Sequence, residues 1–130
     1  MGRYRLSLIV WLFLVALLGY WFRFDAPMPA GLRDGIGGAA YVIFFVVAFA
    51  TNTPASSTAR IALIVLAVTC ALEFLQLWHP VWLEQIRRTL PGRALLGTTF
   101  GWTDFPPYFA GAAIGWALVR LHQRALPALT

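Results

Sequence analysis

Two short segments of an otherwise apolar chain carry the side chains that could do chemistry. The first reads ALEFLQLWHP over residues 71–80 and places a carboxylate, Glu73, inside a hydrophobic run. The polar stripe of this segment consists of Thr69, Glu73, Gln76 and Pro80. Their spacings of four, three and four put them on one face of a helix. An ionisable group in such a setting normally faces the interior of a helix bundle and has a partner there.

A second polar stripe follows later in the chain. It consists of Asp104, Tyr108, Gly111 and Gly115. Because its spacings are again four, three and four, two antiparallel helices could bring the stripes face to face. Glycines allow close backbone approach, so we expect Gly111 and Gly115 to pack against the helix that carries Glu73. Asp104 precedes FPPYF, and an aspartate there can instead cap a helix whose first turn tolerates prolines.

The sequence does not identify which residue pairs with the Glu73 carboxylate. The candidates are Gln76, Tyr108, Arg87, Arg88 and Arg93. An arginine of the following loop could form a bidentate ion pair, whereas the tyrosine or the glutamine could donate a hydrogen bond. Glu73 could also stay protonated in apolar surroundings. The cluster would serve either to bind a ligand or to clasp the helices together.

The same residues also allow a catalytic or a metal-binding interpretation. Glu73, His79 and Asp104 could converge as metal ligands, and Glu73 with His79 could act as an acid and a base. The sequence has no HExxH, no cysteine pair, no nucleophile elbow and no phosphate loop. We therefore expect no catalytic residue, no metal site and no cofactor. His79, next to Pro80, is more simply an interfacial residue.

The composition indicates what must position these residues. The 130 residues are 60% hydrophobic and only 12% charged, with a mean hydropathy of +0.73, which is too apolar for a soluble domain of this size. A net charge of +5 would suggest nucleic acid in a soluble chain, but these basic residues are all arginines between or beyond apolar runs. That pattern is typical of loops that flank membrane spans. The sequence thus predicts membrane lipids, and no nucleic acid, as its surroundings.

The chain is predicted to be one all-α membrane domain, residues 1–130, with four transmembrane helices. The spans are placed near residues 6–23, 35–51, 60–79 and 104–120, each close to the length that crosses a bilayer. Residues 81–90 alternate so that a helix there would be amphipathic and could lie on the membrane surface. The Pro-Gly pair at Pro91 and Gly92 is expected to end that helix.

Orientation follows from the arginines. With the N-terminus inside, five arginines are cytoplasmic and five are external, so the count ties. Two features favour a cytoplasmic N-terminus: the RYR segment precedes the first span, which usually dominates orientation, and all five cytoplasmic arginines lie in short segments near helix ends. Both termini are therefore predicted to be cytoplasmic. The first apolar run continues into YWF and lacks a small-residue cleavage site, so we interpret it as an uncleaved anchor.

The segment from Glu73 onward resembles a bacterial family of small, uncharacterised four-helix membrane proteins. The matching residues are Glu73, Gln76, His79, Trp82, Arg87, Gly97, Phe100, Trp102, Asp104 and Gly111. The E-F-x-Q, aspartate and G-x-x-x-G skeleton is similar, more distantly, to VanZ-like proteins, which are linked to resistance to teicoplanin-type glycopeptides. Two features depart from these patterns: Gly38 stands where an acid is common, with Asp34 one turn earlier, and the asparagine usual after the last aspartate is missing. The resemblance implies the cell envelope as a setting.

Two hypotheses of function follow from these residues. The first is a multi-pass protein of the bacterial inner membrane whose outer-facing polar cavity binds a lipid headgroup or an envelope precursor. The second is a non-catalytic subunit of a larger complex or homo-oligomer, in which the same residues only clasp the bundle. An enzyme acting on lipid headgroups ranks third.

Overall fold

The computed structural model describes residues 2–25, 27–52, 58–96 and 101–125, and within these ranges all regular structure is helical. The long helices are α1 (Arg3–Phe24), α2 (Ala30–Thr51), α3 (Thr58–Leu75) and α6 (Phe105–Ala125). Between α3 and α6 lie the shorter α4 (Val81–Arg88), α5 (Leu90–Leu96) and a 3-10 turn, η2 (Trp102–Asp104). The predicted all-α fold is confirmed.

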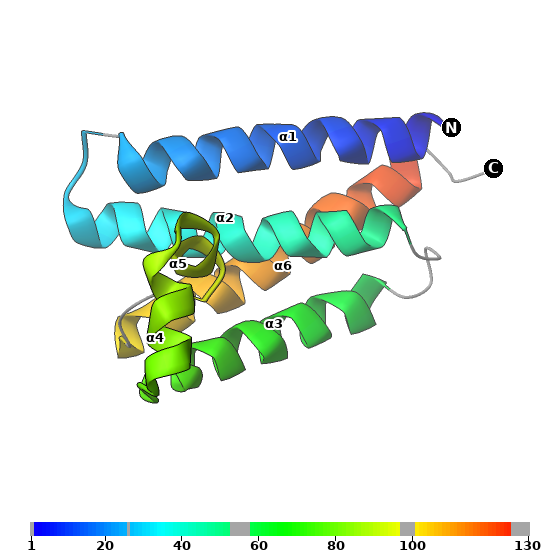
Figure 1. Ribbon diagram of the computed structural model, residues 1–130. Coiled ribbons are helices and arrows are strands. Elements are labelled where there is room, and N and C mark those ends of the chain that lie inside the picture. Colours follow the sequence, from blue (N-terminus) through cyan, green and yellow to red (C-terminus); the bar gives the residue numbers. More distant parts are fainter. Residues whose placement is uncertain (1, 26, 53–57, 97–100, 126–130) are drawn as a thin grey trace.

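Helix α2 lies at the centre of the bundle. It packs on α1 and on α6, and α6 in turn contacts α3. The core between these helices contains Leu8, Val42, Val46 and Val119, all fully buried. Figure 1 shows that the start of α1 and the end of α6 lie at one end of the bundle, whereas α4 and α5 lie at the other. The chain therefore runs back and forth along one axis.

Three helices have the length and composition of membrane spans. Among the described residues, these candidates are Arg3–Phe22, Gly31–Thr51 and Thr58–Leu75. They confirm three of the four predicted spans as apolar helices, while the crossing by α6 remains a prediction. The third span was predicted to reach residue 79, but α3 ends at Leu75. Residues 76 and 77 form a turn, and a side chain described below caps the free carbonyls there.

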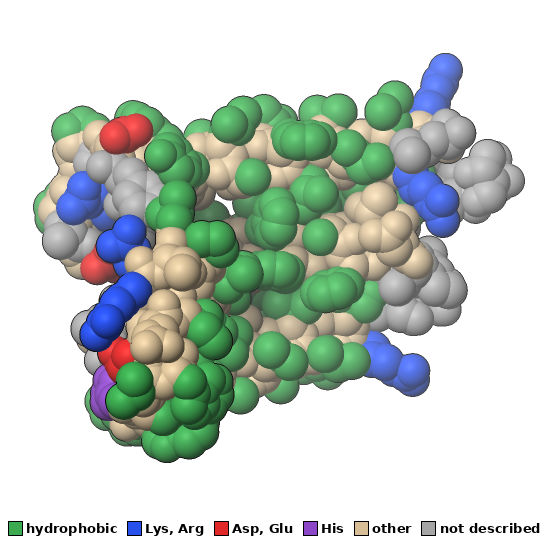
Figure 2. Space-filling view, viewed as in Figure 1, with side chains coloured by type: hydrophobic (Ala, Val, Ile, Leu, Met, Phe, Trp, Pro, Cys, Tyr) green, Lys and Arg blue, Asp and Glu red, His purple; other side chains and the backbone are tan. Residues whose placement is uncertain are grey.

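The lateral surface of the bundle is apolar. Phe13 and Leu17 of α1 are 65% and 68% exposed, and Leu63 of α3 is 66% exposed. On the face in Figure 2, green apolar side chains run along the length of the bundle, and arginines gather at both ends. Such a belt between two charged ends is the surface expected of a protein in a bilayer.

The expected packing partner of the glycine stripe was wrong. A Cβ atom built on Gly111 would lie 2.5 Å from the carbonyl oxygen of Ala39, and one on Gly115 would lie 3.0 Å from Val46 Cβ. Both glycines thus face α2, not the helix that carries Glu73. The spacing correctly marks a face of close approach, but α6 lies against two helices, and its glycines pack on α2.

The predicted stop at Pro91 and Gly92 was also wrong. Helix α4 ends at Arg88, and the Pro-Gly pair lies inside the first turn of α5. Thr89 caps α5, because its hydroxyl oxygen accepts the N–H of Gly92 at 3.0 Å. A proline is tolerated in that turn because its missing N–H would have had no helical partner. The predicted helix over 81–90 is thus present as Val81–Arg88, and its contact with a membrane surface remains a prediction.

Candidate functional site

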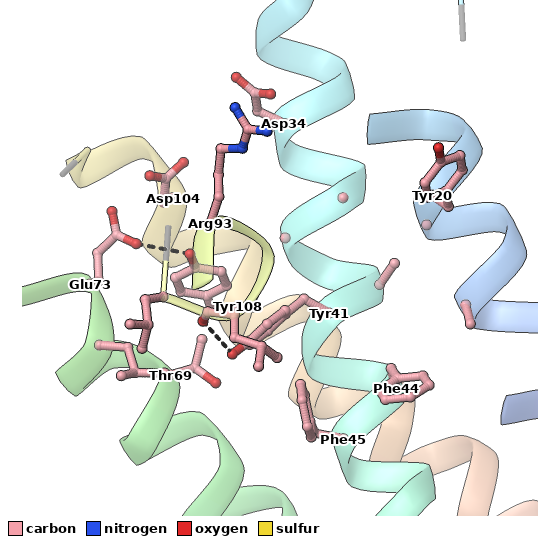
Figure 3. Close-up of a pocket in the computed structure, with 18 of the residues that line it drawn as sticks. Tyr20, Asp34, Tyr41, Phe44, Phe45, Thr69, Glu73, Arg93, Asp104 and Tyr108 are labelled. Carbon is pink, nitrogen blue, oxygen red and sulfur yellow. Dashed lines mark hydrogen bonds between the residues drawn. The ribbon is translucent and has the colours of Figure 1, made fainter. Parts of the chain in front are cut away.

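A cavity of about 470 Å³ lies toward the end of the bundle that carries α4 and α5. Residues of α1, α2, α3, α5 and α6, together with Asp104 of η2, line it. Its polar lining consists of Tyr20, Asp34, Tyr41, Thr69, Glu73, Gln76, Arg93, Asp104 and Tyr108, and much of its apolar lining of Val15, Phe44, Phe45, Leu72, Leu90, Leu95 and Leu96. Figure 3 shows the polar side chains that converge there. Such a mixture of apolar walls and a few polar groups is usual in ligand-binding sites.

Glu73 is buried in the wall of this cavity and is 1% exposed. Its Oε2 accepts a hydrogen bond from the Tyr108 hydroxyl at 2.9 Å, and its Oε1 accepts one from the backbone N–H of Gly101 at 2.9 Å. The predicted contact with Tyr108 is confirmed. Because both carboxylate oxygens accept hydrogen bonds from protein donors, Glu73 joins α3 to α6 and to the residue that precedes η2.

Gln76 lies one turn further along the same wall and is 7% exposed. Its Nε2 donates to the carbonyl oxygen of Leu96 at 2.7 Å, whereas its buried Oε1 has no hydrogen-bond partner in the described structure. From the opposite side, the Tyr41 hydroxyl donates to the carbonyl oxygen of Leu95 at 2.9 Å. These are carbonyls of the last turn of α5, which lack helical donors. The two side chains therefore fasten the end of α5 to the turn after α3 and to α2.

Charged side chains surround the polar end. Asp34 comes from α2, Arg93 from α5 and Asp104 from the end of η2. In Figure 3 the Arg93 side chain extends toward Asp34, and Asp104 lies on the same side as Glu73. Asp104 directly precedes α6, in the position where a helix cap was predicted.

Two predicted members of the cluster lie elsewhere. Arg87 and His79 do not line the cavity. Arg87, 3% exposed, donates to the carbonyl oxygens of Leu75 and Trp78, both at 2.9 Å, and pairs with Glu84. It therefore caps the carboxyl end of α3, where carbonyls lack partners. Of the candidate partners of Glu73, Arg87 forms no ion pair with it in the described part of the chain, because this capping role places the guanidinium outside the cavity.

His79 pairs with Glu84 on the surface. Its Nδ1 lies 2.9 Å from Glu84 Oε1, and both side chains are substantially exposed. The hydrogen bond with His79 lowers the pKa of Glu84, and the hydrogen bond from Arg87 lowers it further by a smaller amount. This cluster links α4 to the residues after α3 and is separate from the cavity.

Sequence reasoning missed Tyr41 and the backbone donor of Gly101. A signal for Tyr41 exists: Asp34, Gly37, Gly38 and Tyr41 follow at spacings of three, one and three. These spacings place small and polar residues on one face of α2, and all four line the cavity. No comparable signal marks Gly101, because the donor belongs to the backbone.

Metal ligation finds no support in the described residues. They contain no group of three or more histidine, cysteine, aspartate or glutamate side chains able to hold a metal ion. The chemistry available to the cavity is hydrogen bonding and charge pairing at one end and apolar contact along its walls.

The described residues form a helical bundle whose three apolar helices are compatible with a multi-pass membrane protein, with a mixed polar and apolar cavity near one end. The chain belongs to the family described as protein of unknown function DUF2809, whose model matches residues 28–112. The predicted membership of an uncharacterised family is thereby confirmed. The match extends from just before α2 into α6 and includes the polar lining of the cavity apart from Tyr20 of α1. No solved structure matches the chain.

Proposed function

We propose that this protein is an integral membrane protein of the bacterial cell envelope whose cavity binds an amphipathic molecule, a lipid headgroup or a lipid-linked envelope precursor. The observation that carries the proposal is the cavity of about 470 Å³, which places Glu73, Gln76 and Tyr108 beside apolar walls. An amphiphile fits both surfaces, because its polar end can meet the hydrogen-bonding groups while its chains contact the aromatic and aliphatic side chains.

The same proposal includes four membrane crossings. Helix α6 has 21 residues, about 32 Å at 1.5 Å per residue, enough for a hydrocarbon core of about 30 Å. Its end lies beside the start of α1 (Figure 1), as an even number of crossings requires. VanZ-like proteins supply only an analogy here, since the family match carries no link to them.

Charge supports cytoplasmic termini in the inner membrane. The helix ends near the termini carry five arginines and no acid: Arg3, Arg5, Arg60, Arg120 and Arg124. The other five of the ten arginines and all five acids belong to the cavity end, so the formal charges of the two ends are +5 and zero. Arginines in short segments at helix ends favour the cytoplasmic side. The cavity would then face the outer leaflet, with α4 at its surface.

A second candidate function rests on a different observation. The two hydrogen bonds of Glu73 both come from the protein itself. A carboxylate satisfied in this way can act as a purely structural clasp, and the exposed apolar faces of the long helices could then contact a partner protein or another copy.

Native mass spectrometry of the protein in mild detergent separates these functions. Ala16 of α1 lines the cavity and is exposed, so Ala16→Phe should obstruct part of it, whereas Ala67→Phe places the same side chain on an exposed site of α3 outside it. Binding predicts a retained adduct of lipid mass that is lost in Ala16→Phe and kept in Ala67→Phe. A retained protein partner or homo-oligomer without such an adduct would favour the structural function.

A further inference from the structure

The charges of the cavity are unbalanced. Among its described lining residues, three carry carboxylates, Asp34, Glu73 and Asp104, and one, Arg93, carries a guanidinium. With all four ionised, the lining has a net negative charge. A site with a negative net charge attracts a cationic group and repels an anionic one. The lining therefore argues against a purely anionic headgroup.

Gln76 adds a requirement for a hydrogen-bond donor. The Leu96 carbonyl oxygen can only accept, so the amide nitrogen of Gln76 must face it, at 2.7 Å. This leaves Oε1 buried without a donor, on a side chain that is 93% buried and lines the cavity. Buried polar atoms in folded proteins nearly always have partners. An occupant with an N–H or O–H group would supply the missing one.

Arg93 supplies the complementary charge at the same polar end. Its side chain is exposed and extends toward Asp34 in Figure 3. A guanidinium binds phosphate through several parallel hydrogen bonds. Further along the cavity, Val15, Phe44 and Phe45 offer apolar walls for acyl chains.

We propose that the cavity is selective for a zwitterionic phospholipid whose headgroup ends in a primary ammonium. The ammonium donates to Gln76 Oε1 on the side of the cavity that carries Glu73 and Asp104, and the phosphate lies toward Arg93. This inference rests on the proposed function and names the class of ligand. A quaternary ammonium has the same charge but no N–H, so it cannot satisfy Gln76.

Lipid titration of the full-length protein by native mass spectrometry tests this selectivity. The probes are phosphatidylethanolamine, phosphatidylcholine and phosphatidylglycerol with identical acyl chains, and glycerophosphoethanolamine, which has the headgroup but no chains. We expect phosphatidylethanolamine to bind about tenfold more tightly than the choline lipid, the effect of one charge-assisted hydrogen bond. The anionic lipid should bind more weakly still, and the chainless headgroup should not bind measurably.

Variants connect that preference to the named residues. Gln76→Met should make the ethanolamine and choline lipids bind equally. Arg93→Gln should weaken both without changing their ratio, and Arg88→Gln, an exposed arginine outside the cavity, should change neither. Asp34→Asn should improve binding of the anionic lipid, whereas Asp25→Asn, exposed and outside the cavity, should not. Since Arg93 and Asp34 are both exposed, Arg93→Gln and Asp34→Asn should fold, and their lipid affinities test the inference even if Gln76→Met does not fold.

Each result decides a specific point. Equal or tighter binding of the choline or anionic lipid by the unmodified protein would overturn the ammonium selectivity and leave lipid binding in place. Equal binding of the chainless headgroup would show that the occupant is a soluble amine, which also overturns the inference. If none of the phospholipids binds, this inference is wrong, and so is the proposed binding of a phospholipid headgroup.

Discussion

The two hydrogen bonds of Glu73 allow its contribution to stability to be estimated. Glu73→Leu removes the acceptor of the Tyr108 hydroxyl and of the Gly101 N–H. An unsatisfied buried donor costs about 1–3 kcal/mol, or about 2–6 kcal/mol for two. Both donor residues are only partly buried, so water can reach them in part, and we expect about 2–4 kcal/mol.

Glu73→Gln should cost less, because the amide can keep both contacts. Its oxygen can accept from Gly101, and its NH₂ group can donate to the Tyr108 oxygen once that hydroxyl has rotated. What is lost is the extra strength of hydrogen bonds to a charged acceptor, about 1 kcal/mol for each bond. Glu73→Gln should therefore lower the free energy of unfolding by about 1–2 kcal/mol.

Unfolding in detergent, followed by circular dichroism, measures these differences, with Asp25→Asn as the matched surface control. Combining Glu73→Leu with Tyr108→Phe should cost about 1–2 kcal/mol less than the sum of the single changes, because they remove the same hydrogen bond. Additive losses would mean that Glu73 and Tyr108 do not interact. If the leucine and glutamine variants were as stable as Asp25→Asn, the clasp would be refuted.

Other contacts give further predictions. Gly111→Leu should cost at least about 2 kcal/mol, because the new side chain must displace the α2 backbone, whereas Leu at the exposed Ala113 should be tolerated; equal melting temperatures would exclude close packing there. Arg87→Met should cost about 2–4 kcal/mol, because carbonyls at the end of α3 lose their donors, and unchanged hydrogen exchange at that end would contradict this. The pKa of Glu84 is lowered in the folded protein, so its stabilising effect should be present at neutral pH and lost as the pH falls below the usual range of glutamate. In Glu84→Gln, the melting temperature should therefore fall less steeply as the pH is lowered. An unchanged dependence of the melting temperature on acidic pH would argue against the contact of Glu84 with His79 and Arg87. Reporter fusions should behave as cytoplasmic at the C-terminus and as external at Gly92, and the reverse result would invert the topology.

Much of the fold could be predicted because it follows from local properties of the sequence. Apolar runs of nearly bilayer length predicted the long helices, and the stripes predicted the meeting of Glu73 with Tyr108. The end of α3 could not be predicted in this way. It depends on Arg87, twelve residues beyond Leu75, which donates to the carbonyls there. A cap supplied from the next helix leaves no local signal.

The site was harder to predict where the contacts involve the backbone. Spacing shows which residues share a face of α6, but it does not show which neighbour that face meets. Gly111 consequently packs on α2 although Tyr108, on the same stripe, reaches α3. The acceptors of Gln76 and Tyr41 are carbonyl groups of α5, which every sequence contains. Only the folded chain distinguishes these carbonyls from the others.

At the end of α3, the cavity wall contains two polar side chains, Glu73 and Gln76, that differ in whether their oxygen atoms have hydrogen-bond donors. Glu73 has hydrogen bonds from the protein on both carboxylate oxygens, whereas Gln76 has a buried oxygen without a donor. A side chain whose partners are all internal contributes mainly to stability, and one that lacks a partner can gain it from a ligand. A structural clasp and a binding site can therefore exist one helical turn apart. Changes at Glu73 should act first on unfolding, and changes at Arg93, which is exposed, should act on lipid binding without loss of stability.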